Sequence, residues 1–163
     1  CIGPLQDNFS NALRVVEFVE LYRLMGASHF YFYHLNASEE VMRVVEHYVQ
    51  LGLADLLQWN VQNHLKDLHY AGIVAQFNDC VYRAMVVDNY RYAAVVDLDE
   101  ILMPLKHNSL ADFVRQCDEG RTSAFVFRNV FLHNKDSNDV FSMPERTVNR
   151  MLYTQTKVSF CIL

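Results

Sequence analysis

The chain has few residues of the kinds that build linkers. Its 163 residues include only 5 glycines and 3 prolines, whereas 52% of them are hydrophobic. A chain of this length, rich in apolar side chains and poor in linker material, can fill one packed core. We therefore expect a single domain over residues 1–163.

The chain also lacks a long apolar run and an excess of positive charge. No stretch approaches the roughly 20 apolar residues of a membrane span, and the start has no signal-peptide layout. The formal net charge is -5, and the Lys and Arg residues are scattered. Scattered basic residues argue against a surface that coats the phosphates of a nucleic acid. We expect no nucleic-acid partner.

The two ends of the sequence suggest a piece of a larger domain. The chain begins with Cys1 rather than Met and closes on an apolar run, Val158–Leu163. Such a run is typical of a strand that has been cut short. We expect an incomplete domain that is truncated at its C-terminal end.

No pair of cysteines has the C-x-x-C spacing that is typical of a structural zinc site. The four cysteines, Cys1, Cys80, Cys117 and Cys161, lie far apart in the sequence. Two disulfides and four buried thiols are both compatible with this distribution. We expect Cys80 to pack in the core rather than to react.

Strands and helices alternate over the first 97 residues, beginning with a short strand. Helical spacing of apolar residues predicts helices over 11–25, from Ser38 to Gly52, and over 68–88. Short apolar or aromatic runs predict the remaining strands, which are 29–33, 53–58 and 92–96. The run Tyr92–Val96 contains no polar side chain except the tyrosine hydroxyl, which is typical of a parallel strand covered on both faces. The order predicts an α/β fold with a Rossmann-like, mainly parallel sheet flanked by helices.

Caps and buried faces of these helices can also be predicted. Asn8 or Ser10 would cap the first helix, and Ser38 would cap the second. Gly26 and Gly52 would end them. The inward side chains of the third helix are predicted from its apolar stripe: Ile73, Val74, Phe77, Val81 and Met85.

The regular alternation ends after residue 97. A short helix is predicted over 110–117 and a strand over 124–127. A polar loop follows over 133–139, and one or two strands are predicted within 151–163.

An acidic pair, Asp97 and Asp99, directly follows the last apolar strand of the alternating half. Ligands of open parallel sheets bind beyond the carboxyl ends of the strands. In an extended segment residues i and i+2 point the same way, so both carboxylates can converge on one site. A hard divalent cation with oxygen ligands would relieve their repulsion. The pair therefore predicts a divalent-metal site.

Two other interpretations of the acidic pair are open. A single Asp after a strand is commonly a turn former or helix cap, but two carboxylates next to Glu100 exceed what a turn needs. Phosphatases of the haloacid dehalogenase type also use Asp-x-Asp after an apolar strand, with the first Asp as nucleophile. Those enzymes usually place Thr or Val where Ile101 stands, and place the motif on the first strand rather than the fourth.

Several segments together resemble glycosyltransferase family 92, a group of galactosyltransferase-like proteins with the GT-A fold. The resemblance covers most of residues 1–105 and is carried by Gly3-Pro4-Leu5, by Val16–Tyr33 with its Gly-Ala-Ser-His-Phe segment, by Gln76–Arg83 with Asn-Asp-Cys, and by Val96–Pro104 around the acidic pair. Many transferases have the acidic pair alone. Its combination with the other segments is far more particular.

The resemblance implies a metal-dependent hexosyltransferase. It implies UDP-galactose as donor, Mn2+ as cofactor and transfer with inversion onto a glycan acceptor. Asp99 would be the direct metal ligand, and Asp97 would serve the ribose or a metal-bound water. Residues 1–105 would form the nucleotide-sugar-binding half, and 106–163 would begin the acceptor-side half. The full protein would face the Golgi lumen, with its membrane anchor upstream of Cys1.

Further donor contacts can be placed from the topology. Pro4, Leu5 and Asn8 follow the first strand, where uracil and ribose would lie, although Asn8 could equally be a cap or a glycan site. His34 and Asn36 end the second strand and could face the same base or form a surface turn.

The predicted third helix carries three adjacent polar positions, Gln76, Asn78 and Asp79, which helix interiors do not favour. They would contact the donor, or bond to a neighbouring loop on an exposed face.

Catalysis also needs a general base for the acceptor hydroxyl. Asp136, Asp139 and Glu145 lie in the expected half, and His133 is a possible metal or substrate contact, but no pattern selects one of them. A third metal ligand would be expected beyond residue 163. The alternative is therefore a catalytically inactive, glycosyltransferase-like binding protein.

Two acceptor patterns for N-glycosylation begin at Asn8 and Asn36. They would suit a protein whose loops are exposed in a secretory compartment.

Overall fold

The computed structural model describes residues 1–60, 72–104, 106–118, 120, 124–131 and 157–160. Two compact units share the chain. The first comprises Cys1–Val16 and Ser28–Leu98, and the second comprises Glu17–Ala27 and Asp99–Leu163. Helix α1 (Ala12–Leu24) therefore contributes residues to both units.

Parallel pairing organises the first unit. Strand β1 (Phe30–His34) pairs in parallel with β2 (Ala54–Gln58). On its other side, β1 meets the N-terminal segment, residues 1–5, through the bridge between Leu5 and His34. A second parallel bridge joins Ile2 to Val96. The order across the sheet is thus β2, β1, N-terminal segment and Val96, which confirms the parallel arrangement that the sequence predicts.

The predicted strand over Tyr92–Val96 is wrong in its extent. Only Val96 forms a bridge, and it alone of the five residues is buried. Tyr92 and Val95 are 39% and 41% exposed. The apolar run therefore does not mark a strand covered on both faces: its backbone bonds to the N-terminal segment involve only Ala94 and Val96, and Tyr92 and Val95 are exposed.

Capping residues fix the starts of α1 and α2 (Glu39–Gln50). The side chain of Ser38 accepts a hydrogen bond from the amide of Val41, which confirms Ser38 as the cap of α2. Neither Asn8 nor Ser10 caps α1; instead Asn11 accepts from the amide of Arg14 at 3.0 Å. Asn11 occupies the position whose side chain can reach a free amide of the first turn, whereas Asn8 lies too far upstream.

Helix α3 (Ile73–Tyr82) continues into a π-helical turn, η3 (Arg83–Val87). The predicted inward face of this helix is wrong in part. Val74 is 71% exposed and Met85 is 43% exposed, Ile73, Phe77 and Val81 are half-buried, and the buried side chains are Gln76, Cys80 and Ala84. These three positions are four residues apart and so lie on one helical face. Small and polar residues point inward here because a disulfide and a hydrogen bond hold that face against the N-terminal segment.

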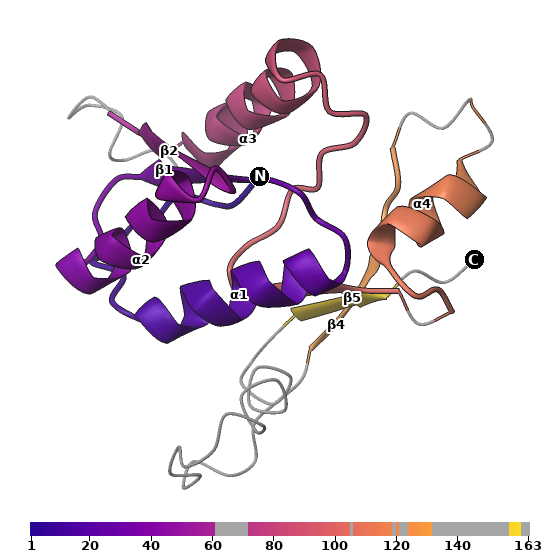
Figure 1. The fold of residues 1–163 in the computed structure, drawn as a ribbon, viewed down its shortest axis with the longest axis horizontal. Coiled ribbons are helices and arrows are strands. Elements are labelled where there is room, and N and C mark those ends of the chain that lie inside the picture. Colours follow the sequence, from indigo (N-terminus) through magenta and orange to yellow (C-terminus); the bar gives the residue numbers. More distant parts are fainter. Residues whose placement is uncertain (61–71, 105, 119, 121–123, 132–156, 161–163) are drawn as a thin grey trace, which may run out of the picture. The chain divides into compact units, whose positions relative to one another are not determined.

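Helices cover both faces of the β1–β2 pair. Figure 1 shows α3 on one face and α2 on the other. Side chains alternate along β1, so Tyr31 and Tyr33 pack with Cys80 and Ala84 of α3 and η3. Phe30 and Phe32, also buried, point to the opposite face. Because β1 is buried on both faces, its aromatic run forms the centre of the first unit.

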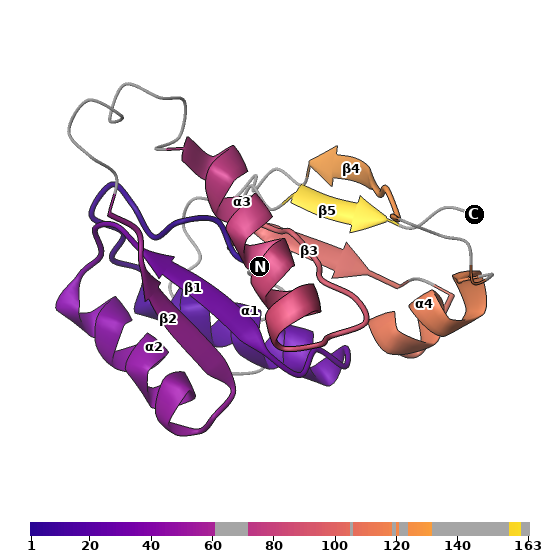
Figure 2. The same cartoon turned by 90° about the horizontal axis from the view of Figure 1, so that it is seen from above.

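The second unit contains a separate three-stranded sheet. Its strand order is β3 (Glu100–Met103), β5 (Lys157–Phe160) and β4 (Arg128–Phe131), with β3 and β5 parallel and β4 and β5 antiparallel (Figure 2). The strand predicted over 124–127 lies instead over Arg128–Phe131. Helix α4 (Leu110–Cys117) has the predicted bounds, and Ser109 caps it.

The second half of α1 is tied to β3 by one buried tyrosine. The hydroxyl of Tyr22 donates to the carbonyl of Glu100 at 3.1 Å and accepts from the amide of Leu102 at 3.0 Å. Burial raises the pKa of Tyr22.

The described chain is a mixed α/β protein with a small parallel sheet and flanking helices. None of its described helices combines the length and the apolarity needed to traverse a bilayer.

Candidate functional site

The first unit has a topological switch point between the N-terminal segment and Val96. From the N-terminal segment the chain passes to β1 and then to β2, and it later returns to the opposite side at Val96. In open parallel sheets a ligand binds in the crevice beyond the carboxyl ends of the strands where the strand order reverses in this way. The residues at this point are Gly3 and Pro4 on one side and Asp97 on the other.

Gly3 lies directly against the side chain of Asp97. A Cβ atom added to Gly3 would stand 2.5 Å from Oδ1 of Asp97, closer than real Cβ contacts allow. The amide of Gly3 also donates to the carbonyl of Val96 at 3.3 Å, directly before that aspartate. The half-buried Asp97 thus occupies space that only a residue without a side chain leaves open.

Asp99 differs from Asp97 in exposure. Asp99 is exposed and lies in the turn that leads into β3. Within the described ranges no three His, Cys, Asp or Glu side chains gather closely enough to hold a metal ion. Leu98 and Asp99 form a turn rather than the extended segment from which the convergence of the two carboxylates was predicted, so that convergence remains a prediction.

The other predicted positions near this edge have different environments. Pro4 is half-buried, whereas Leu5 is only 2% exposed, and its carbonyl accepts from the amides of Leu35 and Asn36. His34 ends β1, and its Nδ1 lies 3.1 Å from Oε1 of Gln58. Of these residues only Pro4 has both partial exposure and a place beside Gly3. The side chain of Leu5 belongs to the core.

The two glycosylation candidates lie on neighbouring segments. Asn8 and Asn36 are both exposed. A parallel bridge joins Phe9 to Ala37, the residues that follow them. The structure therefore brings the two sequence patterns side by side.

The three polar residues of α3 have internal bonding partners. Gln76 is 0% exposed, and its Nε2 donates to the carbonyl of Ile2 at 2.8 Å. Exposed Asn78 donates to the carbonyl of Val74 in its own helix. Asp79 accepts from the hydroxyl of Tyr33 at 2.5 Å. Their predicted contact with a donor remains a prediction.

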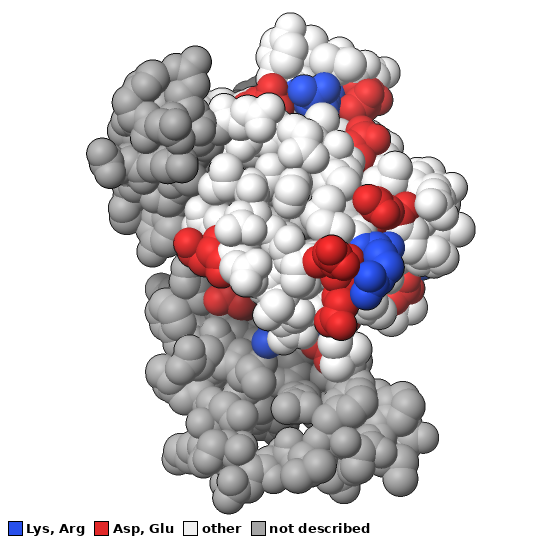
Figure 3. Space-filling model, turned by 90° about the vertical axis from the view of Figure 1, so that its left-hand side faces the viewer, with Lys and Arg blue, Asp and Glu red and all other residues white. Residues whose placement is uncertain are grey.

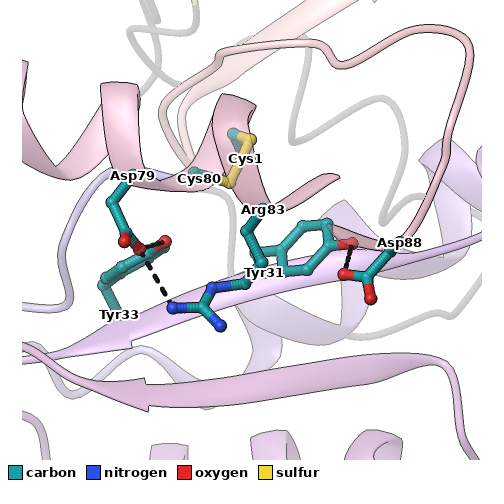
Figure 4. Close-up of polar contacts among 7 residues, drawn as sticks. All are labelled: Cys1, Tyr31, Tyr33, Asp79, Cys80, Arg83 and Asp88. Carbon is teal, nitrogen blue, oxygen red and sulfur yellow. Dashed lines mark hydrogen bonds and ion pairs between the residues drawn. A yellow bond between two sulfur atoms is a disulfide. The ribbon is translucent and has the colours of Figure 1, made fainter. Parts of the chain in front are cut away.

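Sequence reasoning missed a set of tyrosine–carboxylate contacts between β1 and the segment 79–88. Tyr33 bonds to Asp79, which also pairs with Arg83 at 3.5 Å, and Tyr31 bonds to Asp88 at 2.6 Å (Figure 4). Burial, reinforced by the hydrogen bonds to the carboxylates, raises the pKa of both tyrosines. The only sequence signal for this set was the adjacent polar pair Asn78-Asp79.

The same contacts change the pKa of Arg83. Burial by itself lowers the pKa of its guanidinium, but Tyr33 and Asp79 raise it overall. Tyr33 and Arg83 therefore keep their protons over the ordinary pH range, which suits a structural connection.

A disulfide joins Cys1 of the N-terminal segment to Cys80 of α3. This bond lies beside the tyrosine contacts (Figure 4). Cys80 is fully buried, as predicted, and Cys117 is a free, half-buried thiol. Cys161 lies outside the described residues. Four buried thiols are thereby excluded, because the described residues contain one disulfide and one half-buried free thiol.

Surface charge and a surface hollow are two further features of the described residues. On the face drawn in Figure 3 the basic side chains are few and lie among acidic ones. A hollow of about 430 Å³ lies between α1 and α2 and is lined by seven residues: Ala12, Val16, Glu40, Arg43, Val44, His47 and Tyr48. It shares no residue with the switch point.

Four further candidates cannot be placed: His133, Asp136, Asp139 and Glu145 lie outside the described residues.

The comparison with known proteins agrees with the resemblance seen in the sequence. Residues 1–159 match the family model of glycosyltransferase family 92. No curated protein and no solved structure matches the chain. Since the matched region covers nearly the whole sequence, the chain belongs to glycosyltransferase family 92.

Proposed function

We propose that this chain is the donor-binding part of an inverting, metal-dependent hexosyltransferase with the GT-A fold. The donor would be UDP-galactose and the acceptor a glycan. The observation that supports this proposal is the placement of Asp97 against Gly3 at the switch point. A carboxylate at this edge would face the ribose and diphosphate of a nucleotide sugar bound beyond the carboxyl ends of the strands.

The acidic pair fits a hard divalent cation such as Mn2+. Only Leu98 separates Asp97 from Asp99, and consecutive Cα atoms are about 3.8 Å apart, so the chain itself keeps both carboxylates within reach of a small ligand. Carboxylate oxygens suit Mg2+, Ca2+ and Mn2+. Because no three His, Cys, Asp or Glu side chains gather within the described residues, oxygens of the diphosphate would have to complete the coordination that Asp97 and Asp99 begin.

Each residue at the switch point would have a distinct role in binding the donor. Asp99, which is exposed, would bind the cation directly, and Asp97 would hold the ribose or a metal-bound water. Pro4 would lie beside the uracil, and Leu5 would contribute only its backbone. When bound, the cation offsets the negative charge that develops on the departing nucleoside diphosphate. We leave Gln76, Asn78 and Asp79 out of the proposed donor contacts because Nε2 of Gln76, Nδ2 of Asn78 and one carboxylate oxygen of Asp79 already have hydrogen-bond partners within the protein. Oε1 of Gln76 is buried and has no partner among the described residues.

The cellular location follows the same proposal. We place the protein on the lumenal side of the Golgi membrane, held by an anchor outside this sequence. The disulfide between Cys1 and Cys80 supports an oxidising compartment. The exposed Asn8 and Asn36 support contact with the glycosylation machinery.

Glycosylation can be tested directly on protein from a secretory host. Enzymatic deglycosylation should lower its mass, and Asn8→Gln and Asn36→Gln would show which position carries the glycan.

Calorimetry with UDP, with and without Mn2+, tests the donor site. We expect Mn2+ to tighten UDP binding to the wild type by at least about tenfold, and Asp99→Ala to abolish this gain. Glu46→Ala, which removes an exposed carboxylate of α2, is the matched control and should bind like the wild type. If UDP binds the wild type equally well with and without Mn2+, the metal-dependent donor site is wrong.

Turnover requires a separate assay. UDP release from UDP-galactose and UDP-glucose, with galactosylated and fucosylated glycans as acceptors, would identify the donor and acceptor classes. Metal-dependent UDP binding without release under any of these conditions would favour the non-catalytic binding protein. Family membership gives no support to the phosphatase alternative.

A further inference from the structure

We infer that Gly3 is a positioning residue for the donor site: its missing side chain leaves the space in which the carboxylate of Asp97 is held. The inference deepens the proposed function and rests on it for its consequence in binding. Its structural basis is the 2.5 Å distance between Oδ1 of Asp97 and a Cβ built on Gly3.

The reason for a glycine at this position is space rather than backbone conformation. Four other glycines, Gly26, Gly52, Gly72 and Gly120, have positive φ angles that side chains disfavour. Gly3 is not among them. An alanine could therefore adopt its backbone conformation, and the obstacle to a side chain is the carboxylate of Asp97.

The backbone around Gly3 is held by hydrogen bonds on both sides. The amide of Ile2 donates to Tyr31, and the amide of Leu5 donates to Tyr33, at 3.3 and 2.8 Å. On the opposite side Gly3 donates to Val96, and Val96 donates to Cys1 at 3.0 Å. The N-terminal segment is thus fixed between β1 and Val96, and it cannot withdraw from Asp97 without breaking part of the sheet.

Helix α3 adds a third restraint to the same segment. Gln76 donates to the carbonyl of Ile2, and Cys80 is covalently bonded to Cys1. Both contacts involve residues directly before Gly3. With the backbone restrained in this way, the short and half-buried side chain of Asp97 is what must yield to an added methyl group.

The test compares Gly3→Ala with the wild type by calorimetry, measuring UDP binding with and without Mn2+. We expect the gain from Mn2+, which is the ratio of the affinities with and without metal, to fall by about tenfold or more, as when a group that orients a metal ligand is changed. A merely structural defect would weaken binding with and without metal by the same factor and so leave this gain unchanged. Gly52→Ala is the control, because it strains a turn with positive φ but its Cβ meets nothing within 4 Å. It should keep the full gain from Mn2+.

A crystal structure of metal-free Gly3→Ala gives a second readout that does not depend on the donor. The Asp97 carboxylate should move while the backbone of residues 1–5 and Val96 stays in place. An unmoved carboxylate, or an undiminished gain from Mn2+, overturns the inference. If Mn2+ does not tighten UDP binding to the wild type, the proposed function fails. In that case the position of the Asp97 carboxylate in the crystal structure of Gly3→Ala still decides whether Gly3 positions it.

Discussion

The hydroxyl group of Tyr33 on β1 donates a 2.5 Å hydrogen bond to the carboxylate of Asp79 on α3, which also pairs with Arg83. The tyrosine ring is buried, so this bond connects the centre of the sheet to the helix that covers it. Asp79 keeps Arg83 as a partner when the hydroxyl is removed. The contact is therefore suited to measurement by substitution.

Tyr33→Phe should lower the free energy of unfolding by about 1.5–3 kcal/mol, because a hydrogen bond to a charged group is lost. Asp79→Asn weakens the same bond. The double variant should cost at least about 0.5 kcal/mol less than the sum of the two single changes, since both act on one contact. Urea unfolding measures all three. Strictly additive costs would show that the two side chains do not interact in solution.

The buried tyrosines predict a loss of stability at high pH. Burial and the hydrogen bonds to Asp88 and Asp79 raise the pKa of Tyr31 and Tyr33 above the ordinary value of 10.0. Their contribution to stability is complete below pH 10.0. Above it the unfolded chain loses these protons while the folded chain keeps them, so stability falls as the pH rises toward the folded-state values.

Urea unfolding at about pH 9 and about pH 11 measures this loss. Tyr33→Phe should reduce the difference between the two conditions, whereas Tyr82→Phe, which changes a tyrosine that is 63% exposed, serves as control. An unchanged difference in Tyr33→Phe would contradict the assignment of the high-pH loss to this residue.

The disulfide between Cys1 and Cys80 should carry a large share of the stability of the first unit. It closes a loop with a sequence separation of 79 residues, and loss of such a bond typically costs about 2–5 kcal/mol. Cys80→Ser should show this cost in thermal unfolding under oxidising conditions. Cys117→Ser, which changes the free thiol, should leave the unfolding temperature nearly unchanged.

Reducing agent provides the complementary comparison. It should lower the unfolding temperature of the wild type and of Cys117→Ser but have little effect on Cys80→Ser. Equal sensitivity of all three proteins to reduction would mean that the bond does not form or does not stabilise the fold.

The buried face of α3 and η3 can be tested by two opposite changes. Val74 is 71% exposed, so Val74→Ser should change the free energy of unfolding by no more than about 0.5 kcal/mol. Ala84 is 2% exposed and packs with Tyr31 and Tyr33, so Ala84→Leu should cost about 1–3 kcal/mol through overpacking. If Val74→Ser lowered the free energy of unfolding more than Ala84→Leu, Val74 rather than Ala84 would lie on the buried face, as the sequence alone predicts.

Local signals account for the elements that the sequence predicted well. Ser38 before α2 and the apolar spacing within α4 act over a few residues, and both helices form where these patterns place them. The inward face of α3 was mispredicted because distant partners decide it. Gln76 turns toward Ile2 and Cys80 toward Cys1, and neither partner is visible in the periodicity of the helix.

At the candidate site, too, local sequence patterns could be recognised and contacts between distant residues could not. The acidic pair is visible as a pattern because its two members are neighbours in the sequence. Gly3 could be recognised only as part of a family segment, since its role depends on Asp97, which lies far along the chain and meets it through the bridge between Ile2 and Val96. The extent of the strand before Asp97 was mispredicted for the same reason: its pairing depends on a partner at the start of the chain.

The division of α1 between the two units limits how this family can be recombined. The helix supplies residues up to Val16 to the first unit and residues from Glu17 to the second, where Tyr22 bonds to Glu100 and Leu102. A chimera joined only at Leu98 would combine β3 from one parent with the α1 tyrosine of the other. The segments Glu17–Ala27 and Asp99–Leu163 should therefore be inherited together, and a working exchange between relatives needs three junctions rather than one.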